Sequence, residues 1–155
     1  MKINRRFTVL ALAISMVTCL SVMPVSASNN GDTSYTFSLP ASNYYTYTTP
    51  GREKTDTSPS YVNFGSSSNG YVNAYGVQYS IHGGYNSSTR IANCTCGGSS
   101  CIIFPGTARR IHQTVKEDGY SYAFLGASAP NSYVAGKTVT GLWSPDSTGS
   151  SPFAN

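Results

Sequence analysis

The chain has 155 residues, of which only 10 % are charged, and its formal net charge is +4 at pH 7. Three of its ten basic residues lie within the first six positions, so the rest of the chain carries seven basic and six acidic residues. This near balance argues against a strongly basic surface for nucleic-acid binding.

The first 27 residues have the pattern of a secretory signal peptide. The early cationic residues precede an apolar run over residues 7–25, and polar residues follow. Pro24 ends the run, and the small residues Val25 and Ala27 predict cleavage after Ala27. An uncleaved membrane anchor is the alternative, because about 20 apolar residues suffice to span a bilayer. We expect residues 28–155 to be secreted to the extracellular space.

The composition of residues 28–155 favours strands. All twelve tyrosines lie there, whereas leucine occurs only at Leu39, Leu125 and Leu142. Aromatic and β-branched residues suit a pleated, half-buried surface, and the abundant Ser, Gly, Asn and Thr suit turns. We therefore predict an all-β fold, a single antiparallel β-sandwich domain, with a closed barrel as the alternative.

Strands are predicted at 34–39, at about 44–48 and at 138–143 from their aromatic and β-branched residues. Residues 83–100 are rich in Gly, Ser and Asn, which predicts a long loop. The tail from Pro145 onward is predicted to be frayed.

The dipeptide Asn69-Gly70 predicts a type I′ turn, because both residue types tolerate positive φ. The turn would join residues 61–64 and 71–77 in a hairpin. In that register the apolar side chains share one face, and Tyr75 belongs to the core.

The dipeptide Asp118-Gly119 predicts a second hairpin by the same reasoning. Its strands would be residues 107–116 and 120–127. The register again gathers the apolar residues on one face, where Tyr122 would be a core residue.

Three cysteines, Cys94, Cys96 and Cys101, lie in the glycine-rich segment. Outside the cell this favours one disulfide and one unpaired thiol, with the pairing left open. A zinc site that adds His82 or His112 is the alternative, but the spacing matches no standard zinc pattern. We expect no metal and no cofactor.

Candidate binding residues come from a charged segment and from the tyrosines. Arg52, Lys54 and Asp56 alternate, so in a strand they would share one face, either contacting an anionic wall polymer or forming a charged edge against aggregation. Tyrosine surrounded by Ser, Gly and Asn is typical of adaptable binding surfaces. The remaining candidates are Tyr44, Tyr47, Arg110 and His112, the last two on the predicted polar face of a strand.

Three motifs carry a family resemblance. They are Y-T-F-S-L at residues 35–39, R-x-K-x-D-x-S at 52–58, and V-T-G-L-W at 139–143 followed by Ser-Pro-Asp. On these motifs the chain resembles the small secreted proteins of Gram-positive bacteria grouped as domain of unknown function 2712. The resemblance implies export, an all-β domain and a link to bacteriocin-like systems with a dedicated exporter or immunity protein. It supplies no catalytic residue. A fainter similarity is to bacteriocins of the lactococcin 972 type.

The first function hypothesis is a secreted, non-enzymatic binding protein, a bacteriocin-like antagonist that binds a cell-envelope component of other bacteria. The second is a structural protein of the cell surface or matrix. The third is an extracellular hydrolase that uses His82 or His112, although no nucleophile motif accompanies either residue.

Overall fold

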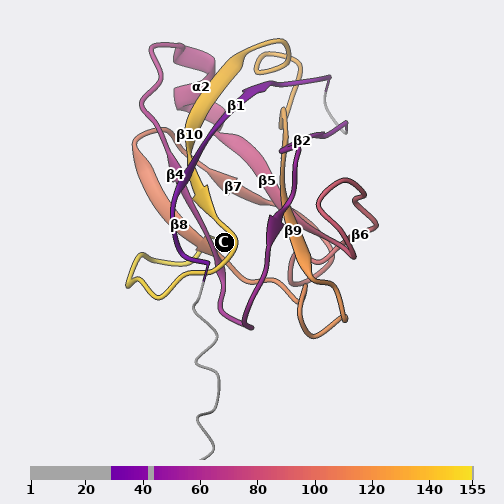
Figure 1. Cartoon of the computed structure of the whole chain (residues 1–155). Helices are drawn as coiled ribbons and strands as arrows, with labels where there is room; N and C mark the ends of the chain where they lie inside the picture. Colours follow the sequence, from indigo (N-terminus) through magenta and orange to yellow (C-terminus); the bar gives the residue numbers. More distant parts are fainter. Residues whose placement is uncertain (1–28, 42–43, 155) are drawn as a thin grey trace, which may run out of the picture.

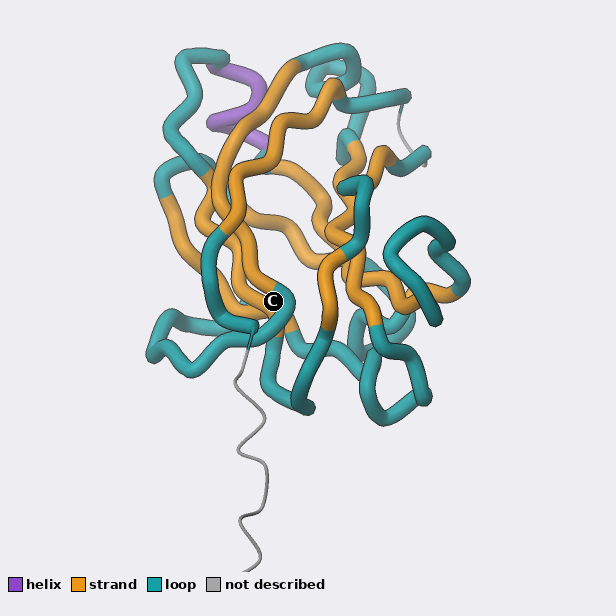
Figure 2. The backbone as a smooth tube through the Cα atoms, viewed as in Figure 1, coloured by secondary structure: helices purple, strands orange, loops and turns teal. Residues whose placement is uncertain are grey.

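The computed structural model describes residues 29–41 and 44–154, so the predicted signal peptide lies outside the described residues. The described chain forms two antiparallel sheets that pack against one another (Figures 1 and 2). The predicted β-sandwich is confirmed. A closed barrel is not formed, because strand β1 ends one sheet and strands β2 and β3 lie at the border of the other.

Sheet A contains both the first and the last strand of the fold. Its order is β1 (Thr33–Ser38), β10 (Thr138–Ser144), β4 (Ser60–Phe64) and β8 (Thr107–Ile111). The β1–β10 ladder extends from Thr33 opposite Trp143 to Ser38 opposite Thr138. The strands predicted at 34–39 and 138–143 are therefore correct to within one residue.

Sheet B is built around the long pair of β5 (Val77–Gly84) and β9 (Tyr122–Ser128). Shorter strands pair with these two: β2 (Thr46–Tyr47) and β3 (Arg52–Glu53) with β9, and β6 (Ala92–Asn93) and β7 (Cys101–Ile103) with β5. The loop predicted at 83–100 thus begins with the end of β5 and contains β6.

The core lies between the sheets and is crossed by a tyrosine pair. Tyr35 of sheet A and Tyr79 of sheet B are 4 % and 0 % exposed, and their hydroxyl oxygens lie 2.8 Å apart. Burial raises the pKa of both phenols, so they stay protonated and hydrogen-bonded. The rings of Phe37 and Phe64 pack beside them. The alternation of buried and exposed residues along β1 places Tyr35 and Phe37 on this inner face.

The hairpin predicted at Asn69-Gly70 is wrong. Asn69 is instead the N-cap of helix α2 (Gly70–Tyr75), and its side-chain oxygen accepts hydrogen bonds from the backbone of Tyr71 and Val72. Asparagine suits an N-cap as well as it suits a type I′ turn, so the dipeptide alone does not distinguish the start of a helix from a hairpin turn. Tyr75 consequently lies on the surface, 43 % exposed, rather than in the core.

The second predicted hairpin is also wrong, although its turn forms. Gly119 has a φ of +82°, and the Tyr120 N–H donates to the Val115 oxygen at 2.9 Å. The flanking strands belong to different sheets, since β8 pairs with β4 and β9 with β5. The turn therefore connects the two layers of the sandwich. Alternation shows which face of a strand is buried but not which strand lies beside it. The predicted core residue Tyr122 is only half-buried.

The tail after Pro145 is packed rather than frayed. Asp146 is fully buried. Further on, the backbone of residues 152–154 runs beside β8, where the Arg110 N–H donates to Pro152 and the Ala154 N–H donates to Arg110. The Phe153 ring stacks on His112 with ring centroids 3.7 Å apart. Buried side chains and backbone hydrogen bonds thus hold this segment.

Candidate functional site

A cleft of about 450 Å³ opens between β1 of sheet A and the segment that connects β2 to β3 in sheet B. Its size lies within the roughly 300–1,000 Å³ usual for ligand pockets. Hydroxyl side chains predominate around it, with two tyrosines and one guanidinium among them. The lining residues are Thr33, Ser34, Tyr35, Thr36, Phe37, Tyr47, Thr48, Thr49, Pro50, Arg52 and Trp143.

The edge of β1, not only one of its faces, forms a wall of the cleft. Residues 33–37 all line it, whereas a wall made by one strand face would contribute every second residue. Leu39 extends the β1–β10 register and donates its N–H to Lys137 at 2.9 Å. Because paired positions alternate in an antiparallel ladder, the backbone N–H and C=O of Ser34 and Thr36 point away from β10. They face the cleft side, and no backbone group in the described part of the chain hydrogen-bonds to them.

Tyr47 and Arg52, two of the predicted binding residues, meet at this cleft. Arg52 donates to the Trp143 carbonyl at 2.9 Å and to Asn29 Oδ1 at 2.8 Å, and its partial burial lowers the pKa of its guanidinium. The guanidinium carbon of Arg90 lies 3.7 Å from the centroid of the Tyr47 ring. Such a cation–π contact fixes the ring at the mouth of the cleft.

His82 lies beneath the Tyr47 ring and is held as a neutral imidazole. The two ring centroids are 4.9 Å apart. Burial and the positive charge of Arg90 lower the pKa of His82 to about 4. Arg90 lies 3.4 Å from Nδ1 and Ser80 Oγ lies 3.1 Å from Nε2. An arginine can only donate, so the imidazole proton is assigned to Nε2, which donates to Ser80.

This geometry does not resemble the triad that the hydrolase hypothesis needs. In a Ser-His-Asp triad the histidine accepts the serine proton and a carboxylate orients the ring. Here Arg90 stands where that carboxylate would lie, and Ser80 is fully buried. The second histidine, His112, is exposed and stacks on Phe153.

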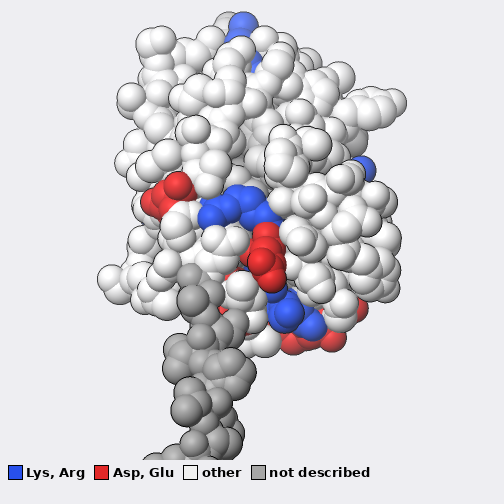
Figure 3. All heavy atoms as spheres, viewed as in Figure 1, with Lys and Arg blue, Asp and Glu red and all other residues white. Residues whose placement is uncertain are grey.

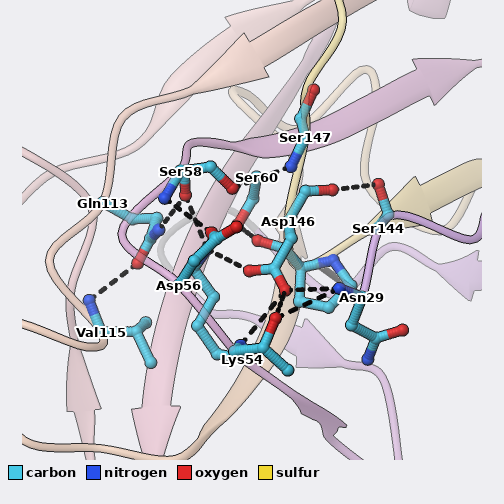
Figure 4. Close-up of polar contacts among 12 residues, drawn as sticks. Asn29, Lys54, Asp56, Ser58, Ser60, Gln113, Val115, Ser144, Asp146 and Ser147 are labelled. Atoms are coloured by element: carbon cyan, nitrogen blue, oxygen red, sulfur yellow. Dashed lines mark hydrogen bonds and ion pairs between the residues drawn. The ribbon is translucent and has the colours of Figure 1, made fainter. Parts of the chain in front are cut away.

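Lys54 is buried, which corrects the prediction that Arg52, Lys54 and Asp56 share one exposed strand face. The side chains of Lys54 and Asp146 are both 0 % exposed and form an ion pair (Figure 4). Strand β3 ends at Glu53, and the chain then turns inward. Lys54 Nζ also contacts Asp56 Oδ1 at 3.3 Å and donates to the Ser58 carbonyl at 2.6 Å. A lysine so enclosed cannot contact an anionic wall polymer.

Asp146 is the centre of this network. Its Oδ2 accepts from the Asn29 N–H at 2.8 Å, from the Thr55 N–H at 3.1 Å and from the Thr55 hydroxyl. Around it, Ser144 Oγ donates to the Asp146 carbonyl at 2.8 Å. Gln113 donates to the same Ser58 carbonyl that Lys54 contacts. The network thus joins the segment before β1, the segment after β3 and the segment after β10 (Figure 4).

Arg110 and His112 are not brought to the cleft. They belong to or follow β8, which lies at the other edge of sheet A from β1, and both pack on Phe153. Tyr44 is 69 % exposed.

In Figure 3 the acidic and basic side chains adjoin one another in the lower half of the face, and most of the upper half is uncharged. This face carries no large patch of one sign.

The predicted disulfide is not present in the structure. Cys94, Cys96 and Cys101 are free thiols. Cys94 and Cys101 are buried, and burial raises the pKa of each thiol to about 11, with Asp118 adding to the effect at Cys94.

Among the described residues, no group of three or more His, Cys, Asp or Glu side chains is placed to hold a metal. The described part of the chain also holds no helix long and apolar enough to cross a membrane.

Several residues of these sites were not predicted. Asp146 falls in the segment expected to be frayed, although it closes the third family motif. Arg90 has no signal in the sequence, because Tyr47 is far away along the chain and His82, although only eight positions before it, comes near only through the turn between β5 and β6. Tyr133 stacks on Tyr71 and Tyr75 of α2, and the three form an exposed tyrosine group.

Comparison with known proteins identifies a family without assigning an activity. The model of the family described as "Protein of unknown function (DUF2712)" matches residues 23–147, which include β1, the cleft and the Lys54–Asp146 pair. Searches of curated proteins and of solved structures give no match. Because the family model covers more than half of the sequence, the chain belongs to the family of unknown function DUF2712.

Proposed function

We propose that this chain is a secreted, non-enzymatic binding protein that binds an extended peptide segment in the cleft beside β1. The observation that carries the proposal is the row of five consecutive β1 residues along the cleft. The backbone groups of Ser34 and Thr36 face away from β10, where a ligand strand can pair with them.

Pairing of a peptide with a sheet edge is a common recognition mode. The main-chain hydrogen bonds supply affinity, and pockets for alternate side chains supply specificity. The cleft offers a main-chain edge for pairing on one side, which is that of β1. On the other side it offers a side-chain contact surface, which is the Tyr47 ring held by Arg90. Hydroxyl groups such as those of Thr33 and Thr48 provide further donors and acceptors.

A matched pair of variants tests the peptide site. Peptides selected from a displayed library of unstructured sequences would be measured by calorimetry against the wild type, Thr36→Pro and Thr36→Ala. Proline removes the outward N–H but is tolerated at a sheet edge, whereas alanine keeps the N–H. We expect Thr36→Pro to weaken binding at least about tenfold, corresponding to the loss of roughly one hydrogen bond. No selected peptide, or equal binding by Thr36→Pro, would refute the site.

The antagonist form of the proposal adds that the bound peptide belongs to an envelope component of other bacteria. It is supported by the predicted signal peptide and by the resemblance that motivated it. Purified residues 28–155 would be added to growing Gram-positive cultures, with Thr36→Pro as the control. Growth inhibition and cell binding by the wild type alone would support this form. The absence of both effects would exclude it.

A structural role at the cell surface is the second candidate, and the Lys54–Asp146 network favours it. A buried contact between segments 92 positions apart suits a domain that must persist outside the cell. The two candidates differ in their expected partners. A structural protein would remain with the producing cells and would bind no peptide at β1.

A further inference from the structure

The buried pair of Lys54 and Asp146 has the layout of a reactive site. A primary amine touches a carboxyl group, and a second carboxylate, that of Asp56, lies 3.3 Å from the same amine nitrogen. Lys54 and Asp146 are wholly withdrawn from solvent. Withdrawing such a pair of charges from water carries a large free-energy penalty, which their mutual attraction offsets only in part.

We propose that Lys54 Nζ and Asp146 Cγ join in an intramolecular isopeptide bond once the chain has folded, with Asp56 relaying the proton. This modification goes beyond the proposed binding function and does not depend on it.

The step balances with loss of one water molecule. Proton transfer from Lys54 to Asp146 converts the ion pair into a neutral amine and a neutral carboxylic acid. The nitrogen lone pair then attacks Cγ, which forms the N–C bond. Asp56 takes the remaining excess proton from nitrogen and returns it to Oδ1, and Oδ1 leaves as water when the C–O bond breaks. The product is a neutral secondary amide, and no oxidant or other reactant is needed.

The neighbours of the amine orient it for attack. A neutral Lys54 amine has two N–H bonds, and two acceptors lie beside it, Asp56 Oδ1 at 3.3 Å and the Ser58 carbonyl at 2.6 Å. When these acceptors hold the two hydrogens, the lone pair is left for Asp146. Fixing both reactants in a hydrogen-bonded ion pair replaces a bimolecular encounter and supplies effective concentrations of up to about 10⁵–10⁸ M.

The other carboxyl oxygen lies in a ready-made oxyanion site. Asp146 Oδ2 accepts the Asn29 N–H at 2.8 Å and the Thr55 N–H at 3.1 Å, and the Thr55 hydroxyl adds a third donor. Negative charge develops on Oδ2 when nitrogen adds to Cγ. Fixed donors at such distances stabilise this charge without reorganisation. The three roles, nucleophile, proton relay and oxyanion site, are therefore all filled by residues in contact with Lys54 or Asp146.

Peptide mapping of the purified full chain tests the bond. Trypsin cannot cleave after an acylated lysine, so a bonded chain yields residues 53–90 joined to residues 138–155, lighter by one water than the two together. The joined product also distinguishes the bond from simple dehydration of Asp146, which would leave the peptides separate. Processing at the N-terminus does not alter these two peptides.

Three variants complete the test. Lys54→Arg keeps the charge but should give no joined peptides, and Lys116→Arg, a half-exposed lysine elsewhere, should give the wild-type pattern. Asp56→Asn should slow joining at least tenfold in a time course that starts from unjoined chain, recovered unfolded and then refolded, with circular dichroism verifying its fold. Separate peptides from the folded wild type would overturn the bond. Joining of Asp56→Asn at the wild-type rate would overturn the relay.

Discussion

Arg90 stacks on the ring of Tyr47 and at the same time approaches His82, whose imidazole is kept neutral by burial and, in addition, by the charge of this guanidinium. The three side chains come from separate segments of sheet B and its loops. Arg90 therefore links the mouth of the cleft to the buried interior of this sheet, and its charge has consequences for stability that can be measured.

The stability of the domain should fall in mild acid because of His82. Folding lowers its pKa from the ordinary 6.5 to about 4, so the unfolded chain binds a proton first. Above pH 6.5 there is no penalty; between 6.5 and 4 the free energy of unfolding drops, by up to about 3 kcal/mol, and below that the effect levels off. Urea unfolding from pH 4 to 7 would measure the slope. His82→Gln should flatten it, whereas His112→Gln should not, and an unchanged slope in His82→Gln would contradict this account.

Substitution of one member of the Lys54–Asp146 pair should cost more than substitution of both. Lys54→Met leaves a buried carboxylate, and Asp146→Leu leaves a buried ammonium; each should destabilise by about 3–5 kcal/mol. The double variant removes both charges and should be more stable than either single one. Denaturant midpoints of the four proteins give the coupling, which includes the amide bond in any wild-type chain in which Lys54 and Asp146 have joined. Strict additivity would mean that the two groups do not interact.

Gly141, in the third family motif, should tolerate no side chain. A Cβ there would overlap the carbonyl oxygen of Asn63 and the hydroxyl of Tyr35, which lies opposite it in the β1–β10 ladder. Gly141→Ala should destabilise by about 1–3 kcal/mol, as overpacking does. Gly31→Ala is the matched control, because a Cβ added at Gly31 would meet no atom within 4 Å. Thermal unfolding compares them, and equal midpoints would show that the ladder relaxes around the added methyl group.

The three thiols should differ sharply in reactivity. Cys96 is exposed and should react with a maleimide in the native protein, whereas Cys94 and Cys101 are buried, with pKa values raised to about 11. Mass spectrometry of residues 28–155, which lack Cys19, should find one label before unfolding and three after it. Fewer than three labels in the unfolded, unreduced protein would reveal a disulfide after secretion.

The strands were predictable where alternation and composition are local properties. The ends of β1 and β10 follow from their own residues, and so does the sandwich class. The choice of neighbouring strands was not predictable. Asn69 and Gly119 correctly indicated a change of direction, but the first begins a helix and the second connects two sheets. A turn dipeptide encodes backbone angles over a few residues, and long-range packing decides which element comes next and where it pairs.

The residues of the candidate sites were likewise predictable only where the signal is local to the sequence. Tyr47 and Arg52 were found from composition and charge, and both line the cleft. Lys54 was misassigned, since alternating charges usually mark a solvated strand and lysine is almost never fully buried without a partner. That partner, Asp146, lies 92 positions away in a segment with no strand pattern. Nothing local to either residue reveals the other.

The position of Asp146 matters for how the fold responds to force. Thr33 and Trp143 are opposite one another at one end of the β1–β10 ladder, so tension applied before Thr33 and after Ser144 would peel the two strands apart one rung at a time. Asp146 sits at that fork and holds Asn29 from one side and Lys54 from the other. Mechanical load would therefore reach the contacts of Asp146 before the Thr33–Trp143 pair could separate.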